Sequence, residues 1–540
     1  MVLYGLALTP LAESLFRGER QLMQAWYADD CALYGPVSAI NRAMNALVEY
    51  GPDFGYYPEP EKSVIIADDN VRDEVKARLA HHNFRYEAGA RYIGAFAGSR
   101  DARLEWLRPQ IDQWVYGIER LAMVARTRPQ EAFAGLTRSL QSEWTYAQRV
   151  CPDLSDEFEP VEQALRETFL PALLGETGGI DNSLRELLGL STKSAGAGIR
   201  DPRTRADAEF RASRECSEEL VNALVLGKEL DIAAHEAQVE WGRINAREAR
   251  AEADSEIFLR LAEQLGPEAK RRMERAKHTG GWLNILPQYR NGTVLSAGEF
   301  RDSIRIRFGL SPLNMPSKCD GCGSKFTLGH AMKCGKGGLV ILRHNEVASE
   351  WSDLCATALS ASAVSIEPSI HNDRTAAAAA TNVRGREPNG NTVPIDARAD
   401  VGVRNFWARQ QTALFDVRVV DTDQPSYAKR EPSKVLNSHE QAKKKKYLEL
   451  CKETRRSFTP LVFSVDGMFS AETSAATKRL ASHLSRKWGR QYSDVCGYVR
   501  CRLQLSLVRS THVCVRGERY KQEVHCKPQW VGGAGLSLTS

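Results

Sequence analysis

Tyr27-Ala28-Asp29-Asp30 is the stretch on which the interpretation of this fold depends. It lies between two short apolar runs, 22–26 and 31–34, and this arrangement predicts the tight turn of a β-hairpin. Two adjacent carboxylates on such a turn can hold divalent metal, which phosphoryl-transfer chemistry uses to bind nucleotide phosphates. An Asp-Asp pair is also common in turns without any catalytic role. The flanking sequence has to decide between these two interpretations.

Two further stretches follow the Asp-Asp turn in the order typical of a known protein family. They are Gly55-Tyr56-Tyr57-Pro58-Glu59-Pro60-Glu61-Lys62-Ser63 and Arg91-Tyr92-Ile93-Gly94-Ala95-Phe96-Ala97-Gly98. In this order, the three stretches resemble the catalytic hairpin, the lysine-bearing loop and the primer-gripping hairpin in the palm of non-LTR retrotransposon reverse transcriptases. The resemblance implies that Asp29 and Asp30 are catalytic metal ligands and that Lys62 helps to bind the cofactor.

The same resemblance identifies what this palm lacks. Reverse transcriptases hold their two metal ions with a third aspartate, on a strand several tens of residues before the Asp-Asp turn. Only 28 residues precede Asp29, and their acids are Glu13 and Glu19, on a predicted helix around 6–16. We therefore expect an incomplete polymerase site that is inactive by itself. An incomplete gene model, with the true start upstream of Met1, is an alternative.

The composition is that of an ordinary globular protein with several domains. A chain of 540 residues predicts three or four domains, and its 42% apolar and 26% charged residues are usual for such proteins. The sequence contains no run of eighteen apolar residues, so it predicts no membrane span. The apolar start at 1–11 lacks the basic leader of a signal peptide. Twelve cysteines without a dense framework favour a reducing compartment, the nucleus or the cytoplasm.

Positive charge is concentrated toward the C-terminus. Residues 400–530 hold 25 Lys and Arg against 13 Asp and Glu, a net charge of +12, so the rest of the chain carries −7 of the total of +5. Such a surface can neutralise nucleic-acid phosphates and release their counterions, which favours DNA and RNA as partners. A solvated surface without a partner is the alternative explanation of the bias.

Between about 101 and 275 the apolar pattern becomes helical. Apolar residues recur every three or four positions in four segments: 104–124, 160–174, 205–226 and 246–265. Ser139-Leu140-Gln141-Ser142-Glu143-Trp144 and Phe169-Leu170-Pro171-Ala172-Leu173-Leu174 resemble the helical thumb and the linker of the same retroelement proteins. Farther on, Ser296-Ala297-Gly298-Glu299 predicts a helix that begins with a capping box and ends near Gly309.

A cluster of cysteine and histidine residues follows this helix. Cys319, Cys322, His330 and Cys334 form the pattern C-x2-C-x7-H-x3-C, and four such ligands at this spacing are typical of a tetrahedral Zn²⁺ site. Buried free cysteines are the alternative. Together with Arg343-His344-Asn345, the cluster resembles the CCHC knuckle of retrotransposons that carry a restriction-like endonuclease.

Two aspartates farther along form a second candidate site. Asp400 ends Ala397-Arg398-Ala399-Asp400, and Asp416 lies inside the β-rich run 413–420, where an ionised carboxylate is costly unless it binds a cation. The pair resembles the restriction-like PD-(D/E)xK superfamily, in which one Asp opens a strand and an acid on the next strand shares its catalytic metal, Mg²⁺ or Mn²⁺. The chain departs from that pattern at Ala399, where proline is common, and at Arg418, where lysine is usual.

The retroelement endonucleases take this lysine from a downstream helix. Glu440-Gln441-Ala442-Lys443-Lys444-Lys445-Lys446-Tyr447 resembles that helix, and its Lys443 and Lys446 are three apart and can face the same way. A lysine near the metal could activate the attacking water or stabilise the phosphorane charge. A solvated face or a localisation signal is the alternative for a run of four lysines. Glu346, just past the knuckle, is a candidate for a further acid.

These stretches cover nearly all of 1–520 in the order of the family and predict a multidomain α+β protein. We expect a partial reverse-transcriptase palm at 1–100, a helical thumb and linker at 101–312, the zinc knuckle at 313–345, an α/β restriction-like endonuclease domain at 346–525 and a tail at 526–540. The predicted function is that of the C-terminal portion of a retrotransposon protein that nicks DNA with a divalent metal. The alternative is a non-catalytic nucleic-acid-binding remnant, which the departures at 399 and 418 leave open.

Overall fold

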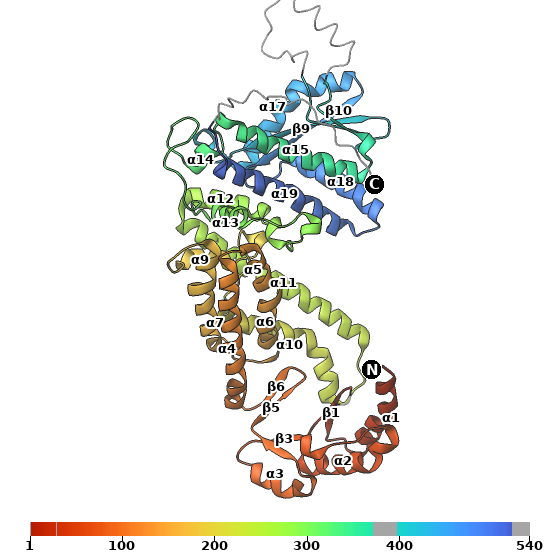
Figure 1. The fold of residues 1–540 in the computed structure, drawn as a ribbon. Coiled ribbons are helices and arrows are strands. Elements are labelled where there is room, and N and C mark those ends of the chain that lie inside the picture. The colour runs from red at the N-terminus through yellow and green to blue at the C-terminus, as the bar shows by residue number, and fades with distance from the viewer. Residues whose placement is uncertain (1, 29, 371–396, 521–540) are drawn as a thin grey trace, which may run out of the picture. The chain divides into compact units, whose positions relative to one another are not determined.

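The computed structural model describes residues 2–28, 30–370 and 397–520, and they form a mixed α+β chain that is mostly helical (Figure 1). The chain divides into two compact units. Unit 1 comprises Met1–Ser194 and Gly198–Arg260, and unit 2 comprises Ala195–Ala197 and Leu261–Ser540. None of the described helices is long and apolar enough to cross a membrane. The predicted tail at 526–540 lies outside the described residues.

The first hundred residues of unit 1 combine short strands with helices. The elements are α1 (Val2–Gly18), β1 (Met23–Tyr27), β2 (Asp30–Tyr34), α2 (Val37–Tyr50), β3 (Val64–Ile66), α3 (Arg72–Leu79), β4 (Arg85–Glu87), β5 (Gly89–Tyr92) and β6 (Ala95–Gly98). Tyr27 pairs with Asp30, which confirms the predicted hairpin, and β5 and β6 form the second predicted hairpin. The predicted helix over 6–16 is also confirmed, but Glu19 lies just beyond its end and pairs with Arg42.

Helices make up the rest of unit 1. They are α4 (Arg100–Ala125), α5 (Pro129–Gly135), α6 (Gln141–Val150), α7 (Glu159–Ala164), α8 (Leu170–Leu174), α9 (Asn182–Gly189), α10 (Pro202–Leu226) and α11 (Ile232–Gln264), whose last residues belong to unit 2. The four predicted helical segments are confirmed. In α4, Leu107, Ile111, Trp114 and Ile118 are buried at three- and four-residue spacing, and the Trp114 ring stacks on Phe158 at a centroid distance of 6.0 Å.

Unit 2 is built on a four-stranded sheet. Its strands are β7 (Val364–Ile366), β8 (Val401–Arg404), β9 (Thr412–Val420) and β10 (Arg456–Ser464), in the spatial order β10-β9-β8-β7. β10 and β9 are parallel, whereas β8 pairs antiparallel with both of its neighbours. β9 confirms the predicted strand, and its nearly continuous apolar sequence reflects burial along most of its length.

Helices cover both faces of this sheet. Because side chains alternate along a strand, those of β9 point in turn into the two helical layers. The helices are α15 (Leu339–Ala358), α17 (Pro432–Glu453), α18 (Ala471–Trp488) and α19 (Tyr492–Arg516). α15, α18 and α19 lie on one face, where Trp351 and Phe415 belong to one buried apolar cluster. α17 covers the other face, where Val435 packs against Val420, and Asp416 points into this second layer.

Two helices that precede the knuckle belong to the same body as the sheet. α12 (Gly266–Thr279) places the buried Arg275 between Asp423 and Asp466, which follow β9 and β10, respectively. α13 (Ala297–Phe308) begins with the predicted capping box, in which the Ser296 hydroxyl accepts from the Glu299 amide and the Glu299 carboxylate accepts from the Ser296 amide. Buried ion pairs and a complete helix cap thus fix the segment that leads to the knuckle.

Candidate metal centre and acidic site

The predicted knuckle is formed by a tight turn and a short helix. Its ligands are Cys319, Cys322, His330 and Cys334. In the turn, the Gly323 amide donates to the Cys319 carbonyl at 2.9 Å, and Gly323 has a φ of +73°, a conformation that favours glycine. His330 lies on α14 (Leu328–Ala331), and its carbonyl accepts from the Cys334 amide at 2.9 Å. The two turns bring all four side chains to one point.

The distances between these side chains match a tetrahedral zinc site. All four ligand atoms lie within 4.8 Å of one another. Sγ of Cys319 is 3.9 Å from Sγ of Cys334, and Sγ of Cys322 is 3.4 Å from Nε2 of His330. A tetrahedral ion with bonds of about 2.3 Å to sulfur and about 2.05 Å to nitrogen separates two sulfur ligands by about 3.8 Å, and a sulfur from a nitrogen ligand by about 3.6 Å. The cluster can therefore bind zinc with little movement.

The two cysteines of the turn lie in different environments. Burial raises the pKa of the Cys319 thiol. Hydrogen bonds to Ser324 lower the pKa of the exposed Cys322 to about 7. Because the thiolate is the form that binds metal, Cys322 is better prepared than Cys319 to bind zinc near neutral pH.

The knuckle packs against the chain that follows α19. The Asp320 carboxylate accepts from the Arg519 amide at 2.6 Å, and the Arg519 guanidinium lies 5.0 Å from the centre of the Phe326 ring. Gly321 has no room for a side chain, because a Cβ there would lie 2.7 Å from Cβ of Arg519. The knuckle is therefore an integral part of unit 2.

The two predicted acids of the second site meet on adjacent strands. Asp400 immediately precedes β8, whose first residue, Val401, pairs with Phe415 of β9, so that Asp400 lies beside Asp416. The Asp400 Oδ2 accepts from the Val417 amide at 2.5 Å, which fixes this carboxylate against β9. The structure thus brings together the two acids that the resemblance pairs.

A lysine and a histidine complete this acidic site. Nζ of Lys443, on α17, is 2.5 Å from Oδ2 of Asp416, and Nε2 of His344, on α15, is 3.0 Å from Oδ1 of Asp400. Burial and the neighbouring Asp400 raise the pKa of Asp416, although Lys443 opposes this shift. The hydrogen bond to Asp400 raises the pKa of His344. Four elements thereby converge on the buried Asp416 and the half-buried Asp400.

Two other candidates lie outside this cluster. Lys446 is exposed, and its ammonium lies 4.9 Å from the centre of the Tyr447 ring. Glu346, the candidate for a further acid, is exposed on α15, and the residue of α15 that contacts Asp400 is His344. Helical spacing could not separate Lys443 from Lys446, because both lie on the same side of the predicted helix.

The departure at Ala399 has a structural cause. Its amide donates a hydrogen bond to the carbonyl of Pro368 at 3.0 Å, and proline has no amide hydrogen to donate. Ala399 is also buried, in an apolar cluster with Ile370 and Leu414. The absence of the usual proline therefore fits the local backbone and does not disturb Asp400.

His344 was not predicted as a member of the acidic site. It is part of the Arg343-His344-Asn345 stretch after the knuckle, and this stretch was the available signal. Arg343, its neighbour, is buried and donates to the Met332 carbonyl at 3.1 Å, so the two adjacent residues serve different sites.

The two candidate polymerase residues that the structure describes, Asp30 and Lys62, form no comparable cluster. Asp29 lies outside the described residues. Asp30 is exposed at the start of β2, and Lys62 is exposed and pairs with Glu59 at 2.5 Å. In the described part of the chain, no hydrogen bond or ion pair connects Lys62 with Asp30.

Comparison with known proteins adds no identification. No protein-family model matches the chain. No curated protein matches it either. The functional argument therefore depends on the geometry of the zinc cluster and of the acidic site.

Proposed function

We propose that unit 2 is a metal-dependent DNA endonuclease and that the chain is the C-terminal portion of a retrotransposon protein. The pairing of Asp400 and Asp416 at the junction of β8 and β9, with Lys443 beside Asp416, carries this proposal. It is the arrangement that the resemblance to restriction-like nucleases requires. DNA would be the substrate, and the RNA of the element would be a second partner.

The carboxylates fit a divalent cation. Oδ2 of Asp416 is buried, and the Lys443 ammonium lies 2.5 Å from it. A buried carboxylate of this kind is stabilised by a nearby cation. A bound Mg²⁺ or Mn²⁺ would polarise the scissile phosphate and neutralise the charge that develops on it.

The surrounding side chains have separate tasks. Asp400 is held by the Val417 amide and by His344, so its position does not depend on a bound cation. Lys443 has three donors and can move from Asp416 toward a phosphate oxygen when the carboxylate binds metal. The zinc cluster would be structural, because it packs against the chain that follows α19.

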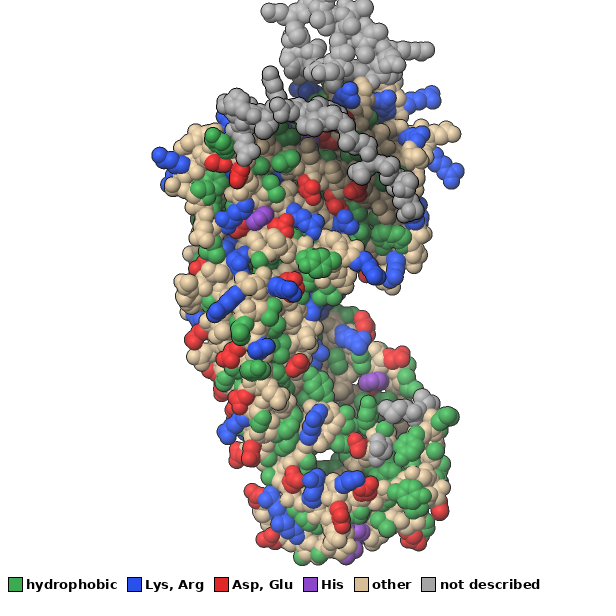
Figure 2. Space-filling model, in the orientation of Figure 1, with side chains coloured by type: hydrophobic (Ala, Val, Ile, Leu, Met, Phe, Trp, Pro, Cys, Tyr) green, Lys and Arg blue, Asp and Glu red, His purple; other side chains and the backbone are tan. Residues whose placement is uncertain are grey.

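A non-catalytic nucleic-acid-binding role is the second candidate. The observation in its favour is that Lys443 already neutralises Asp416 at 2.5 Å, so that the acid pair is stable without metal. Lys and Arg side chains also gather on the upper right of unit 2, near β10, in the view of Figure 2. Binding alone would need this basic surface but not the acids.

Nicking of supercoiled plasmid DNA distinguishes the two functions. We expect Mg²⁺ or Mn²⁺ to support nicking and Asp416→Asn to abolish it while duplex binding is retained, because the acids hold the metal and dispersed cations hold the DNA. Asp494→Asn, which neutralises an exposed acid on α19, is the matched control and should nick normally. Binding without metal-dependent nicking by the unmodified protein would select the second candidate.

A further inference from the structure

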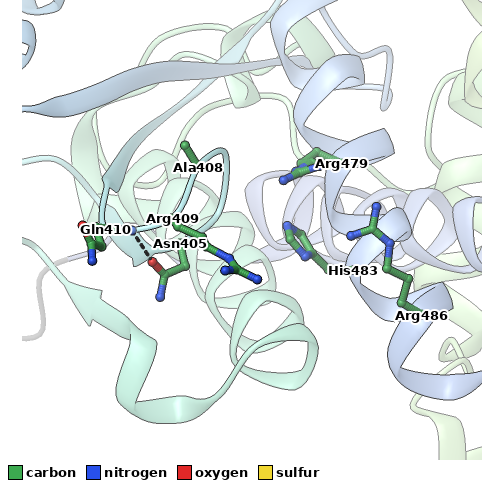
Figure 3. A pocket seen from close by; sticks show the side chains of 7 residues that line it. All are labelled: Asn405, Ala408, Arg409, Gln410, Arg479, His483 and Arg486. Carbon is green, nitrogen blue, oxygen red and sulfur yellow. Dashed lines mark hydrogen bonds between the residues drawn. The ribbon is translucent and has the colours of Figure 1, made fainter.

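A basic hollow opens on unit 2 away from the acidic site. It has a volume of about 500 Å³ and lies between the turn that joins β8 to β9 and helix α18. Figure 3 shows Arg479, His483 and Arg486 on successive turns of this helix, with Arg409 reaching toward them from the turn. Four nitrogen-bearing side chains thus converge on one space.

The frame of this hollow is rigid. Arg479 donates to the carbonyls of Phe406 and Trp407, both at 3.0 Å, and His483 lies 2.9 Å from the Phe406 carbonyl. These bonds join α18 to the turn and fix its backbone. Arg409 and Arg486 are exposed, so they remain available to a ligand.

The positive charge of the hollow is not compensated. No Asp or Glu lines it, and Arg409, Arg479 and Arg486 form no ion pair with the described acids. Burial, together with the charges of Arg479 and Arg486, lowers the pKa of His483, in spite of its bond to the Phe406 carbonyl. An anion in the hollow would relieve this repulsion.

The hollow is separate from the acidic site. Thr412 begins β9 at the end next to the hollow, and Asp416 lies four residues later, about 13 Å along the strand. The two sites also use opposite faces of the sheet, because Phe406 packs in the layer of α18 whereas Asp416 points toward α17. A ligand in the hollow would therefore not touch the two carboxylates.

We infer that this hollow binds phosphate groups in the backbone of duplex nucleic acid, at a distance from the site of cleavage. Arginine is suited to phosphate because its guanidinium can donate two hydrogen bonds at once. The lining includes no Phe, Tyr or Trp on which an unpaired base could stack, which favours a duplex over a single strand. The inference shares only its partner, nucleic acid, with the proposed function.

The test is a salt titration of binding to a fluorescent 20-base-pair DNA duplex. It is performed in the Asp416→Asn background without added divalent metal, so that it does not depend on nicking. Loss of two phosphate contacts in Arg409→Ala/Arg486→Ala should reduce the slope of log K against log salt by about 1.8. When the salt rises from 50 to 200 mM, the fold-loss of duplex affinity in this variant should therefore be about twelve times smaller than the fold-loss in the protein that retains both arginines.

A control variant that loses two other cations, and binding measurements with small anions and single-stranded DNA, can contradict the inference. Lys270→Ala/Arg290→Ala removes two exposed cations elsewhere on unit 2 and should leave the slope unchanged. An unchanged slope in the arginine variant, or an equal loss in the control, would contradict the site. If the arginine variant bound inorganic phosphate or a mononucleotide more weakly but bound the duplex with unchanged affinity, the hollow would be a small-anion site and the inference would be wrong. A larger loss for a single strand than for the duplex would contradict the choice of duplex.

Discussion

Removal of zinc from the knuckle should unfold residues 319–334 while the sheet of unit 2 remains folded. Ordering these sixteen residues costs roughly 16–32 kcal/mol of backbone entropy. Phe326 and Met332 are each less than a tenth exposed, and their burial contributes roughly 3–6 kcal/mol. Zinc binding contributes about 10–16 kcal/mol in small zinc domains. Packing by itself is therefore too weak, and the metal supplies the difference.

Hydrogen exchange measures this effect residue by residue. The amides of Gly323, Phe326 and Cys334 are hydrogen-bonded within the knuckle and report its opening. With free zinc at a thousand times its dissociation constant, the metal stabilises the knuckle by about 4 kcal/mol, which corresponds to about a thousandfold slower exchange. Cys322→Ser should lose the metal and this protection, whereas the amides of β9 and β10 should stay protected.

Two measurements can refute this reasoning. Elemental analysis should find about one zinc per chain in the unmodified protein and much less in Cys322→Ser. Cys496→Ser changes a half-buried cysteine outside the cluster and should retain both zinc and protection. Metal-replete protein without zinc, or unchanged exchange in Cys322→Ser, would show that the four side chains are only packed thiols and an imidazole.

Three further predictions concern unit 2. Asp302, which is 3% exposed, accepts hydrogen bonds from Arg516 and His512, so Asp302→Asn should lower the free energy of unfolding by about 3 kcal/mol. Burial raises the pKa of Asp302, but these bonds lower it below its ordinary value. Its contribution to the free energy of unfolding is therefore fully present above about pH 4 and is lost as the pH falls further. Chemical unfolding should show that the difference in stability between Asp302→Asn and the unmodified protein shrinks over that range. Lys443→Ala should slow nicking at saturating DNA more than Lys446→Ala does, and equal losses in single-turnover assays would contradict the role of the ion pair. Ala399→Pro should lower the free energy of unfolding by about 1–3 kcal/mol, because the Pro368 carbonyl loses its donor, and thermal melting against Ala399→Gly as the control would reveal it.

Local patterns were enough to predict most of the elements. The hairpin at Asp30, the capping box at Ser296 and the strand that holds Asp416 are all confirmed, because each depends on residues a few positions apart. The ligand cluster of the knuckle was predictable for the same reason, since its turn and its short helix are local. The palm, thumb and nuclease labels came from resemblance alone and remain predictions.

Contacts between distant elements could not be predicted in this way. His344 and Asp400 are 56 positions apart, and only the packing of α15 on the sheet brings them within 3.0 Å. The local sequence of α15 does not reveal which polar residue at the edge of its buried face meets a strand end. Packing also separates Lys443 from Lys446, because only the former reaches the layer between α17 and β9.

The departure at Arg418 follows from the same packing. Arg418 and Asp416 are two apart on β9 and therefore point to the same face, toward α17. The Arg418 charge contributes to the lowered pKa of His439, after the larger effect of burial, so Arg418 lies near that residue. Lys443 follows His439 by one helical turn and pairs with Asp416. A cation at 418 is thus directed toward an earlier turn of α17 than the one beside Asp416. In the proposed nuclease the lysine comes from α17, and position 418 is then free to hold an arginine.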